Sequence, residues 1–209
     1  MADAKSSALW IVVSAPSGGG KTTVCQQLLA TRPGLARAIT CTTRAPRPGE
    51  QNGVDYYFFG LDDFERRVTA GEFLEHAVVY GNRYGTLKSE VLGRLRQGQD
   101  VILSVDVQGV EHLCLQARAD EELRRSLITV FLSPPSVKVL EQRLRKRGAD
   151  SEEIILRRLN EARQEISRWT QFDYLIPSGS IAEDLRRMQI ILDAEKLRVS
   201  RSAMALSED

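Results

Sequence analysis

The sequence lacks the marks of membrane, secreted and metal-cluster proteins. Its 209 residues contain no run of about 18 apolar residues, so we predict no membrane-spanning segment and no membrane partner. Residues 1–7 are polar and unlike a signal peptide. The three cysteines, Cys25, Cys41 and Cys114, have no C-x-x-C spacing, which is typical of reduced thiols in a cytoplasmic protein.

Histidine and lysine are also scarce. His76 and His112 are isolated, as packed or surface side chains usually are, rather than clustered like metal ligands. Only six of the 29 basic residues are lysines, which leaves 23 arginines. Arginine binds phosphate in a bidentate manner, so the excess fits a phosphate-handling enzyme, although codon bias in a GC-rich genome explains it equally well. The formal net charge of +1 gives no sign of a nucleic-acid-binding surface.

The clearest motif is a glycine-rich segment that joins an apolar run at 9–13 to a predicted helix at 24–31. The order of strand, glycine-rich turn, Lys-Thr and helix predicts a phosphate-binding loop for a nucleoside triphosphate. Backbone N–H groups of such a loop surround phosphate oxygens, and Lys21 and Thr22 would reach the phosphates and Mg²⁺. Ala15 occupies the place of the first glycine in the usual pattern. The predicted ATP-binding residues are Ala15, Pro16, Ser17, Gly18, Gly19, Gly20, Lys21, Thr22 and Thr23.

Along the chain, predicted strands alternate with predicted helices. We expect strands at 9–14, 38–42, 56–59, 73–79, 101–106, 127–132 and 174–176. We expect helices at 24–31, 62–71 (with Asp62 in a capping arrangement), 88–96, 109–118, 136–147, 151–169 and 181–199, a turn at 81–86, and a loose tail after 200. This alternation predicts a central parallel sheet covered by helices on both faces, with ligands at the carboxyl ends of its strands.

Two segments interrupt this α/β pattern. Residues 40–86 contain short strands and turns and are predicted to form an inserted subdomain. Residues 143–163 are dense in arginine and glutamate and are predicted to form a mobile helical lid. The core is then made of residues 1–39, 87–142 and 164–209, within a single domain.

Three groups of residues are candidates for chemistry. Asp106 ends a predicted buried strand. In phosphate-loop proteins an aspartate at this place lies near Mg²⁺ or the acceptor; the alternative is that Asp106 only caps the next helix. Arg44 and Arg47 lie in a proline-stiffened loop and either grip a phosphate dianion or remain solvated. The basic residues around Gly148 either close over a transferred phosphoryl group or form surface ion pairs such as Glu153–Arg157.

Taken together, the motifs resemble the guanylate kinase family over about residues 8–201. The motifs are the loop at 14–22, Thr42-Thr-Arg-Ala-Pro-Arg-Pro-Gly-Glu with Asn52-Gly-Val-Asp-Tyr, Phe73-Leu-Glu, Gly81-Asn-Arg-Tyr-Gly-Thr, Asp106-Val-Gln-Gly and Pro134-Pro-Ser with Arg143-Leu and Arg147-Gly. The resemblance implies a three-layer phosphate-loop fold with a mixed α/β GMP-binding insertion and a lid. It also implies transfer of the γ-phosphoryl group of ATP, with Mg²⁺, to GMP.

The resemblance further implies roles for individual residues. The GMP phosphate would be held by Arg44, Arg47, Tyr56 and Tyr84. Guanine would be read by Glu75 and Thr86, with Thr40 and Asp106 nearby. The catalytic residues would be Lys21, Arg44, Arg143, Arg147 and Arg158, and Mg²⁺ would be held by Thr22 and, directly or through water, by Asp106. A homo-oligomer is left open.

Two positions depart from the family pattern. Ser104 stands where the family commonly has a second aspartate, which affects the expected Mg²⁺ or water network. Ser178-Gly179 aligns with an Asn-Asp pair that contacts the adenine side. Two rival functions also remain: a phosphate-loop kinase of another small phosphorylated acceptor, such as a ribose bisphosphate, and a non-catalytic module that binds a phosphorylated partner. Glu75 and Thr86 argue against the first, and the intact glycine-rich loop argues against the second.

Overall fold

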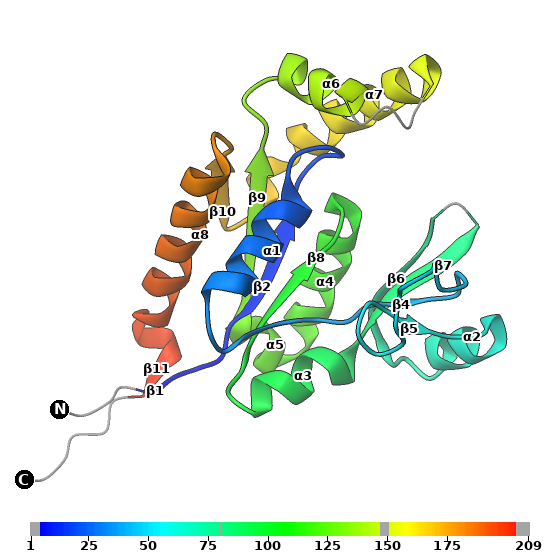
Figure 1. The fold of residues 1–209 in the computed structure, drawn as a ribbon. Coiled ribbons are helices and arrows are strands. Elements are labelled where there is room, and N and C mark those ends of the chain that lie inside the picture. The colour runs from blue at the N-terminus through cyan, green and yellow to red at the C-terminus, as the bar shows by residue number, and fades with distance from the viewer. Residues whose placement is uncertain (1–4, 80, 147–150, 204–209) are drawn as a thin grey trace, which may run out of the picture.

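A five-stranded parallel sheet forms the centre of the molecule. The computed structural model describes residues 5–79, 81–146 and 151–203 (Figure 1). In spatial order the sheet consists of β10 (Tyr174–Pro177), β9 (Leu127–Ser133), β2 (Trp10–Ser14), β8 (Asp100–Ser104) and β3 (Leu35–Arg37). All of its strand pairs are parallel, as the sequence predicted. The carboxyl ends of these strands therefore lie at one edge, where ligands bind in such sheets.

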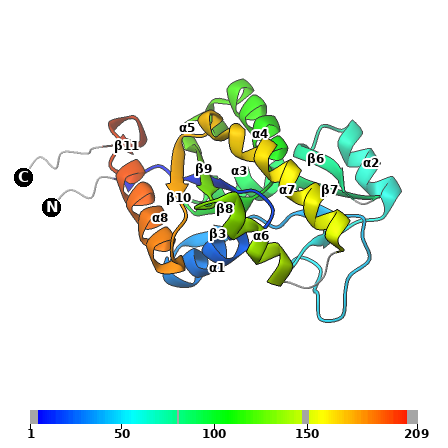
Figure 2. The same ribbon diagram turned by 90° about the horizontal axis from the view of Figure 1, so that it is seen from above.

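Helices cover both faces of this sheet (Figure 2). One face carries α1 (Lys21–Thr31) and α8 (Ile181–Lys196), and the other carries α3 (Lys88–Arg96), α4 (Val107–Ala119) and α5 (Glu121–Ser126). Alternate residues of β2 belong to different cores: Ile11 packs with α1 and α8, while Trp10 packs with α3, α4 and α5. Because both faces are buried, β2 is a continuous apolar run rather than an alternating one.

A second sheet lies beside the first and is built from residues between Cys41 and Leu87. Its strand order is β5 (Tyr57–Phe58), β4 (Cys41–Thr42), β7 (Asn82–Leu87) and β6 (Phe73–Val79), with α2 (Leu61–Thr69) packed against it. Its small core contains Cys41, Phe64, Phe73 and Leu87, and the Phe64 and Phe73 rings stack 4.5 Å apart.

Two helices lie beyond the carboxyl ends of the central strands (Figure 1). They are α6 (Val137–Lys146) and α7 (Glu152–Ser167), and they share a core of their own. That core consists of Leu140, Leu144, Ile155, Leu159 and Ala162. The pair has its own hydrophobic contacts, separate from the two cores of the central sheet.

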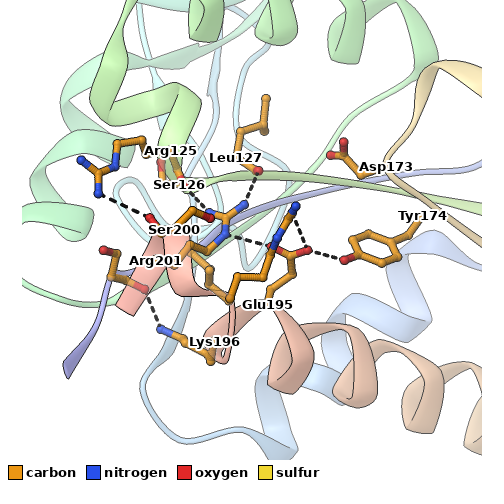
Figure 3. Close-up of polar contacts among 12 residues, drawn as sticks. Arg125, Ser126, Leu127, Asp173, Tyr174, Glu195, Lys196, Ser200 and Arg201 are labelled. Atoms are coloured by element: carbon orange, nitrogen blue, oxygen red, sulfur yellow. Dashed lines mark hydrogen bonds and ion pairs between the residues drawn. The ribbon is translucent and has the colours of Figure 1, made fainter. Parts of the chain in front are cut away.

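A buried ion pair between Glu195 and Arg201 holds the C-terminal segment against the amino-terminal end of the central sheet (Figure 3). Glu195, at the end of α8, is 1% exposed and accepts hydrogen bonds from Tyr174 and Arg198, and one of 2.8 Å from Arg201 Nε. Arg201 lies in the 3₁₀ helix Val199–Arg201 and also donates to the carbonyl of Leu127. Short β1 (Lys5–Ser6) and β11 (Ser202–Ala203) pair beside it. A further 3₁₀ helix spans Trp169–Gln171.

Several sequence-based boundaries were wrong. Of the predicted strand 38–42, only Cys41–Thr42 is a strand, β4 of the second sheet, and β3 of the central sheet lies just before the predicted segment, at Leu35–Arg37. The predicted turn 81–86 lies mostly in strand β7. The predicted final helix stops at Lys196, and the six-residue helix α5 was missed because it is too short for a clear apolar period.

The predicted cap at Asp62 was also wrong. The N-cap residue of α2 is Gly60, and no side chain caps the helix. Asp62 lies inside the first turn, where a carboxylate is stabilised by the helix dipole instead.

Candidate active site

The glycine-rich loop has the backbone that the motif requires. Gly18 and Gly20 have φ angles of +84° and +97°, which side-chain-bearing residues rarely adopt. A Cβ atom on Gly19 would lie 2.8 Å from Ala15 Cβ, so all three glycines are needed. The loop encloses a pocket of about 300 Å³ at the N-terminus of α1. Residues 15–23 line this phosphate pocket together with Asp106 and Glu165.

Lys21 is held at the floor of the phosphate pocket. Its Nζ donates a 2.9 Å hydrogen bond to the carbonyl of Val105, just beyond β8. Burial lowers the pKa of Lys21, although the negative charges of Asp106 and Glu165 oppose that shift. A phosphate anion bound beside Lys21 would stabilise its charged form, because it would replace the solvation that burial has removed.

Asp106 has the capping role that was one of the two alternatives left open by the sequence. Its Oδ1 accepts a 2.7 Å hydrogen bond from the Gly109 N–H and so caps α4. The residue also lines both the phosphate pocket and a second pocket of about 210 Å³. Asp106 therefore marks the boundary between the two. We call the second one the acceptor pocket; it lies between the two sheets and is lined by Thr40, Tyr56, Glu75 and Tyr84 among others.

Glu75 is the half-buried acid that lines the acceptor pocket. It extends from β6, and Thr86 on the neighbouring β7 donates a 2.7 Å hydrogen bond to its Oε1. Burial raises the pKa of Glu75 to about 7, with a smaller opposing effect from the Thr86 hydrogen bond and a reinforcing one from Asp106. Thr86 is fully buried, so in this geometry it positions the Glu75 carboxylate.

Arg44 lies beside Tyr56, one of the residues that line the acceptor pocket. Its guanidinium forms hydrogen bonds of 2.9 and 3.0 Å with both carboxylate oxygens of Glu50 and lies 5.5 Å from the centre of the Tyr56 ring. The Tyr84 ring meets Tyr56 edge-on at 6.2 Å. Arg47 is exposed, and its backbone N–H donates to Glu50. Of the two arginines, Arg44 is therefore the one held beside the pocket.

Among the predicted lid arginines, Arg143 lies beside the glycine-rich loop. Arg143 Nη1 lies 4.0 Å from the point that a Cβ on Gly20 would occupy. Arg158 is half-buried on α7. Arg147 lies outside the described residues. The expected Glu153–Arg157 pair gives way to an Arg157–Glu161 contact of 3.7 Å, one turn further along the helix.

A third pocket, of about 290 Å³, continues from the phosphate pocket. The two share Gly18, Gly20 and Thr23, and the third pocket extends to Ser178 and Gly179. We call it the base-side pocket, because a nucleotide whose phosphates lie in the loop would extend into it. The first departure from the family pattern, Ser104, lies elsewhere: it lines the acceptor pocket at the end of β8.

Sequence reasoning missed several residues of these pockets, among them His112 and Glu165. His112 was interpreted as a packed or surface side chain, and the structure places it, exposed, at the wall of the acceptor pocket. Glu165 was overlooked, although it lies three residues after Ala162 on the inward side of α7. Burial raises the pKa of Glu165, while Lys21 lowers it, and so does a hydrogen bond from the Ser17 N–H.

The oxygen donors of the phosphate pocket suit Mg²⁺. Thr22 supplies a hydroxyl and Asp106 a carboxylate to the same pocket. Within residues 5–79, 81–146 and 151–203, no group of three or more His, Cys, Asp or Glu side chains could enclose a metal by itself. Mg²⁺ is usually bound by one or two protein oxygens together with substrate phosphates and water, so this donor set fits it. Among the described helices none is both long and apolar enough to span a bilayer.

The central parallel sheet carries a glycine-rich phosphate-binding loop, and the acceptor pocket and the arginine-bearing helices α6 and α7 lie beside that loop. This arrangement defines a phosphate-loop kinase fold. The guanylate kinase family model matches residues 7–195, and the chain belongs to the guanylate kinase family, whose members are nucleoside monophosphate kinases. Phosphoryl transfer from ATP to a small nucleotide follows from this membership. Neither rival function is favoured.

Individual relatives agree with this assignment. The guanylate kinase of Symbiobacterium thermophilum is 45% identical over 204 residues, covering 98% of this chain and 93% of that protein. The guanylate kinase of Paramagnetospirillum magneticum is 42% identical over 193 residues, covering 92% and 87%. The crystal structure of guanylate kinase from Anaplasma phagocytophilum superposes with a TM-score of 0.73 at 32% identity, covering 96% of this chain and 92% of that one.

Proposed function

We propose that the protein transfers the γ-phosphoryl group of Mg·ATP to GMP and releases ADP and GDP. The observation that carries this proposal is the half-buried Glu75 carboxylate, held by the fully buried Thr86 at the wall of the acceptor pocket. A carboxylate accepts hydrogen bonds from both N1–H and the 2-amino group of guanine. Adenine lacks this pair of donors and would leave this acid unpaired, which costs a few kcal/mol.

The acceptor phosphate is proposed to bind at the rim of the same pocket. Arg44 is oriented there by Glu50 and by the Tyr56 ring, and Tyr84 lies next to Tyr56. A dianionic phosphate would draw the guanidinium from Glu50, because it offers more charge and equally good bidentate geometry. Arg47 would join it from the exposed part of the loop. Residues 40–86 thus act as the GMP-binding insertion.

The donor phosphates are proposed to bind in the glycine-rich loop. Loop N–H groups and the N-terminus of α1 hold the β- and γ-phosphates, and Lys21 moves its ammonium from the Val105 carbonyl to a phosphate oxygen. Thr22 and Asp106 would hold Mg²⁺, which supplies neutralisation of the phosphate charge.

Transfer requires the two nucleotides to be aligned and water to be excluded. Asp106 lines both the phosphate and acceptor pockets, so their reacting ends meet beside it. Arg143, with Arg147 and Arg158, closes over the phosphoryl group as residues 143–163 act as a lid. Catalysis is then positioning and charge stabilisation, with in-line attack and no covalent intermediate. The unpaired cysteines support a cytoplasmic setting.

A coupled ADP-release assay over GMP, AMP, UMP and CMP tests the proposal. We expect GMP to be used at least a hundredfold better than AMP in kcat/KM, since a site built to pair with guanine rejects a base that leaves it unpaired. Comparable turnover of AMP and GMP would contradict the guanine assignment. Turnover of no nucleoside monophosphate would contradict the kinase assignment altogether.

A further inference from the structure

The wall of the base-side pocket contains a buried carboxylate with two defined partners. Asp184 lies in the first turn of α8, is 3% exposed and lines this pocket. Its Oδ2 accepts a 2.6 Å hydrogen bond from the Ser178 hydroxyl, and its Oδ1 accepts one of 3.0 Å from the Gly179 N–H. An ionised carboxylate has about four acceptor positions, so each oxygen keeps capacity for another donor.

The same two contacts remove donors from the loop. The Ser178 hydroxyl and the Gly179 N–H both point to Asp184 and are therefore not presented to a ligand. Two cationic residues, Arg143 and Lys146, also line the pocket, and Arg143 lies next to Gly20, which the base-side pocket shares with the phosphate pocket. The Ser178–Asp184 end of the pocket thus offers hydrogen-bond acceptors to whatever base enters it.

The position of the pocket identifies which base that is. It shares Gly18 and Gly20 with the phosphate pocket, and among the described residues none lines both it and the acceptor pocket. Val24 and Ile181 supply apolar walls that suit a flat ring. A nucleoside triphosphate anchored by its phosphates would place its base here.

We infer that Asp184 is a specificity-determining residue for the phosphoryl donor, with its carboxylate accepting a hydrogen bond from the 6-amino group of adenine. The inference rests on the proposed function for the place of the donor nucleotide. A purine with a carbonyl at position 6 would bring its O6 against the Asp184 carboxylate. Both oxygens are hydrogen-bond acceptors, so binding of such a base is disfavoured. The shortened side chains at Ser178-Gly179 then do not abolish base recognition, because α8 supplies the polar group.

The test measures binding to the whole chain of three probes without GMP: ADP, inosine 5′-diphosphate and inorganic tripolyphosphate. Inosine diphosphate carries a carbonyl in place of the 6-amino group, and tripolyphosphate has no base. We expect the unmodified protein to bind ADP about tenfold or more tightly than inosine diphosphate, the value of one charge-assisted hydrogen bond. Asp184→Asn should bring this ratio close to one, because an amide donates to the carbonyl, and should leave tripolyphosphate binding within about twofold.

Two further variants keep the result interpretable. Ser178→Ala removes one partner of Asp184 but leaves the carboxylate, so the ADP preference should remain. Glu183→Gln removes a neighbouring exposed carboxylate on the same turn of α8 and should change neither ratio nor affinity.

The inference is overturned if the unmodified protein does not discriminate, if Asp184→Asn keeps the discrimination, or if it weakens tripolyphosphate as much as ADP, which indicates a purely structural role. If Asp184→Asn does not fold, Asp184→Ser is measured in its place, and there loss of the ADP preference upholds the inference and its retention overturns it. GMP phosphorylation is measured separately, so an enzyme that phosphorylates GMP without this preference contradicts the inference alone.

Discussion

Glu75 and Thr86 face each other across neighbouring strands, and the Thr86 hydroxyl donates a 2.7 Å hydrogen bond to the Glu75 carboxylate. The pair lies just after an irregularity in the pairing of β6 and β7, between Phe73 and Glu75. Because Thr86 is completely buried, solvent water does not compete for its hydroxyl. The strand pairing therefore fixes the direction in which Glu75 meets a ligand.

Glu75→Gln should damage GMP use selectively. The amide keeps the shape but loses the charge and one of the acceptors needed by the two guanine donors, so we expect KM for GMP to rise about a hundredfold. KM for ATP should stay within about twofold, since Glu75 does not line the phosphate or base-side pocket. Glu72→Gln, an exposed neighbour paired with Arg67, is the matched control. Equal losses for both substrates would contradict the assignment.

The raised pKa of Glu75, about 7, predicts how GMP binding depends on pH. Guanine binding requires the ionised carboxylate, so affinity should fall as pH drops below 7. The GMP phosphate titrates near pH 6, and Asp106 and His112 also line the pocket. The measurement is therefore the ratio of GMP affinities of the unmodified protein and Glu75→Gln between pH 8 and 5.5. This ratio should shrink towards one at low pH, and a constant ratio would contradict the prediction.

The raised pKa of Glu75 also predicts how the free energy of unfolding depends on pH: rising pH should lower stability, although it strengthens GMP binding. A carboxyl whose pKa is higher in the folded protein than its ordinary 4.5 favours folding when protonated. This contribution is fully present below pH 4.5 and is lost as pH rises to about 7. Denaturant unfolding at pH 4.5 and 8 should show a smaller loss of stability with rising pH for Glu75→Gln than for the unmodified protein.

Lys21→Met should remove most of the rate while leaving the fold intact. The ammonium is proposed to stabilise the transferring phosphoryl group, so we expect kcat to fall about a thousandfold or more, which corresponds to about 4 kcal/mol. The midpoint of unfolding should not fall, because Lys21 is a buried cation whose pKa is already lowered by desolvation. Lys138→Met, at an exposed lysine of α6, should keep full activity. A Lys21→Met protein with near-normal kcat would contradict the proposed role.

The parts of the fold set by local pattern were predictable. The buried strands at 9–14 and 127–132 are continuous apolar runs, and the glycine-rich loop follows from residue types that are adjacent in the sequence. The strand at 82–87 was mistaken for a turn because Gly81 and Gly85 are turn-type residues. Gly85 is in fact required inside the strand: a Cβ there would lie 2.8 Å from the Phe73 ring and 2.9 Å from the Glu75 carbonyl. That contact belongs to strand pairing and has no local signal.

Site residues divide in the same way. Lys21 and Asp106 were recognised because each lies in a motif at the start of a helix that follows a buried strand. Glu165 and Asp184 were not recognised. They reach the pockets only because α7 packs over the glycine-rich loop and α8 packs beside β10. Each lies on a helix in a stretch of ordinary amphipathic sequence, and a carboxylate there is normally a surface residue.

The ion pair at the C-terminus should contribute strongly to stability (Figure 3). Arg201 is 8% exposed and Glu195 is 1% exposed, so Arg201→Ala leaves a buried negative charge with fewer partners. We expect a loss of about 3 kcal/mol in the free energy of unfolding, measured by urea denaturation. Arg198→Ala is the control: that side chain is 59% exposed, and its loss should cost less than about 1 kcal/mol. Equal effects of the two variants would contradict the burial argument.

Glu165 places a negative charge in the pocket that receives the triphosphate. It lines the phosphate pocket with Lys21 and attracts that ammonium, so an incoming polyphosphate must overcome its repulsion. Glu165→Gln should therefore bind tripolyphosphate about tenfold more tightly in EDTA at pH 8, measured by calorimetry.

The gain should be smaller with Mg²⁺ present, because the cation neutralises the phosphate charge that Glu165 repels. Glu153→Gln removes an exposed carboxylate from the other end of α7 and should leave tripolyphosphate affinity unchanged. Because Glu165 is half-buried, the difference between Glu165→Gln and the unmodified protein should persist at raised ionic strength, unlike a surface charge effect. Equal or weaker binding by Glu165→Gln would show that the carboxylate supports the phosphate site rather than opposing it.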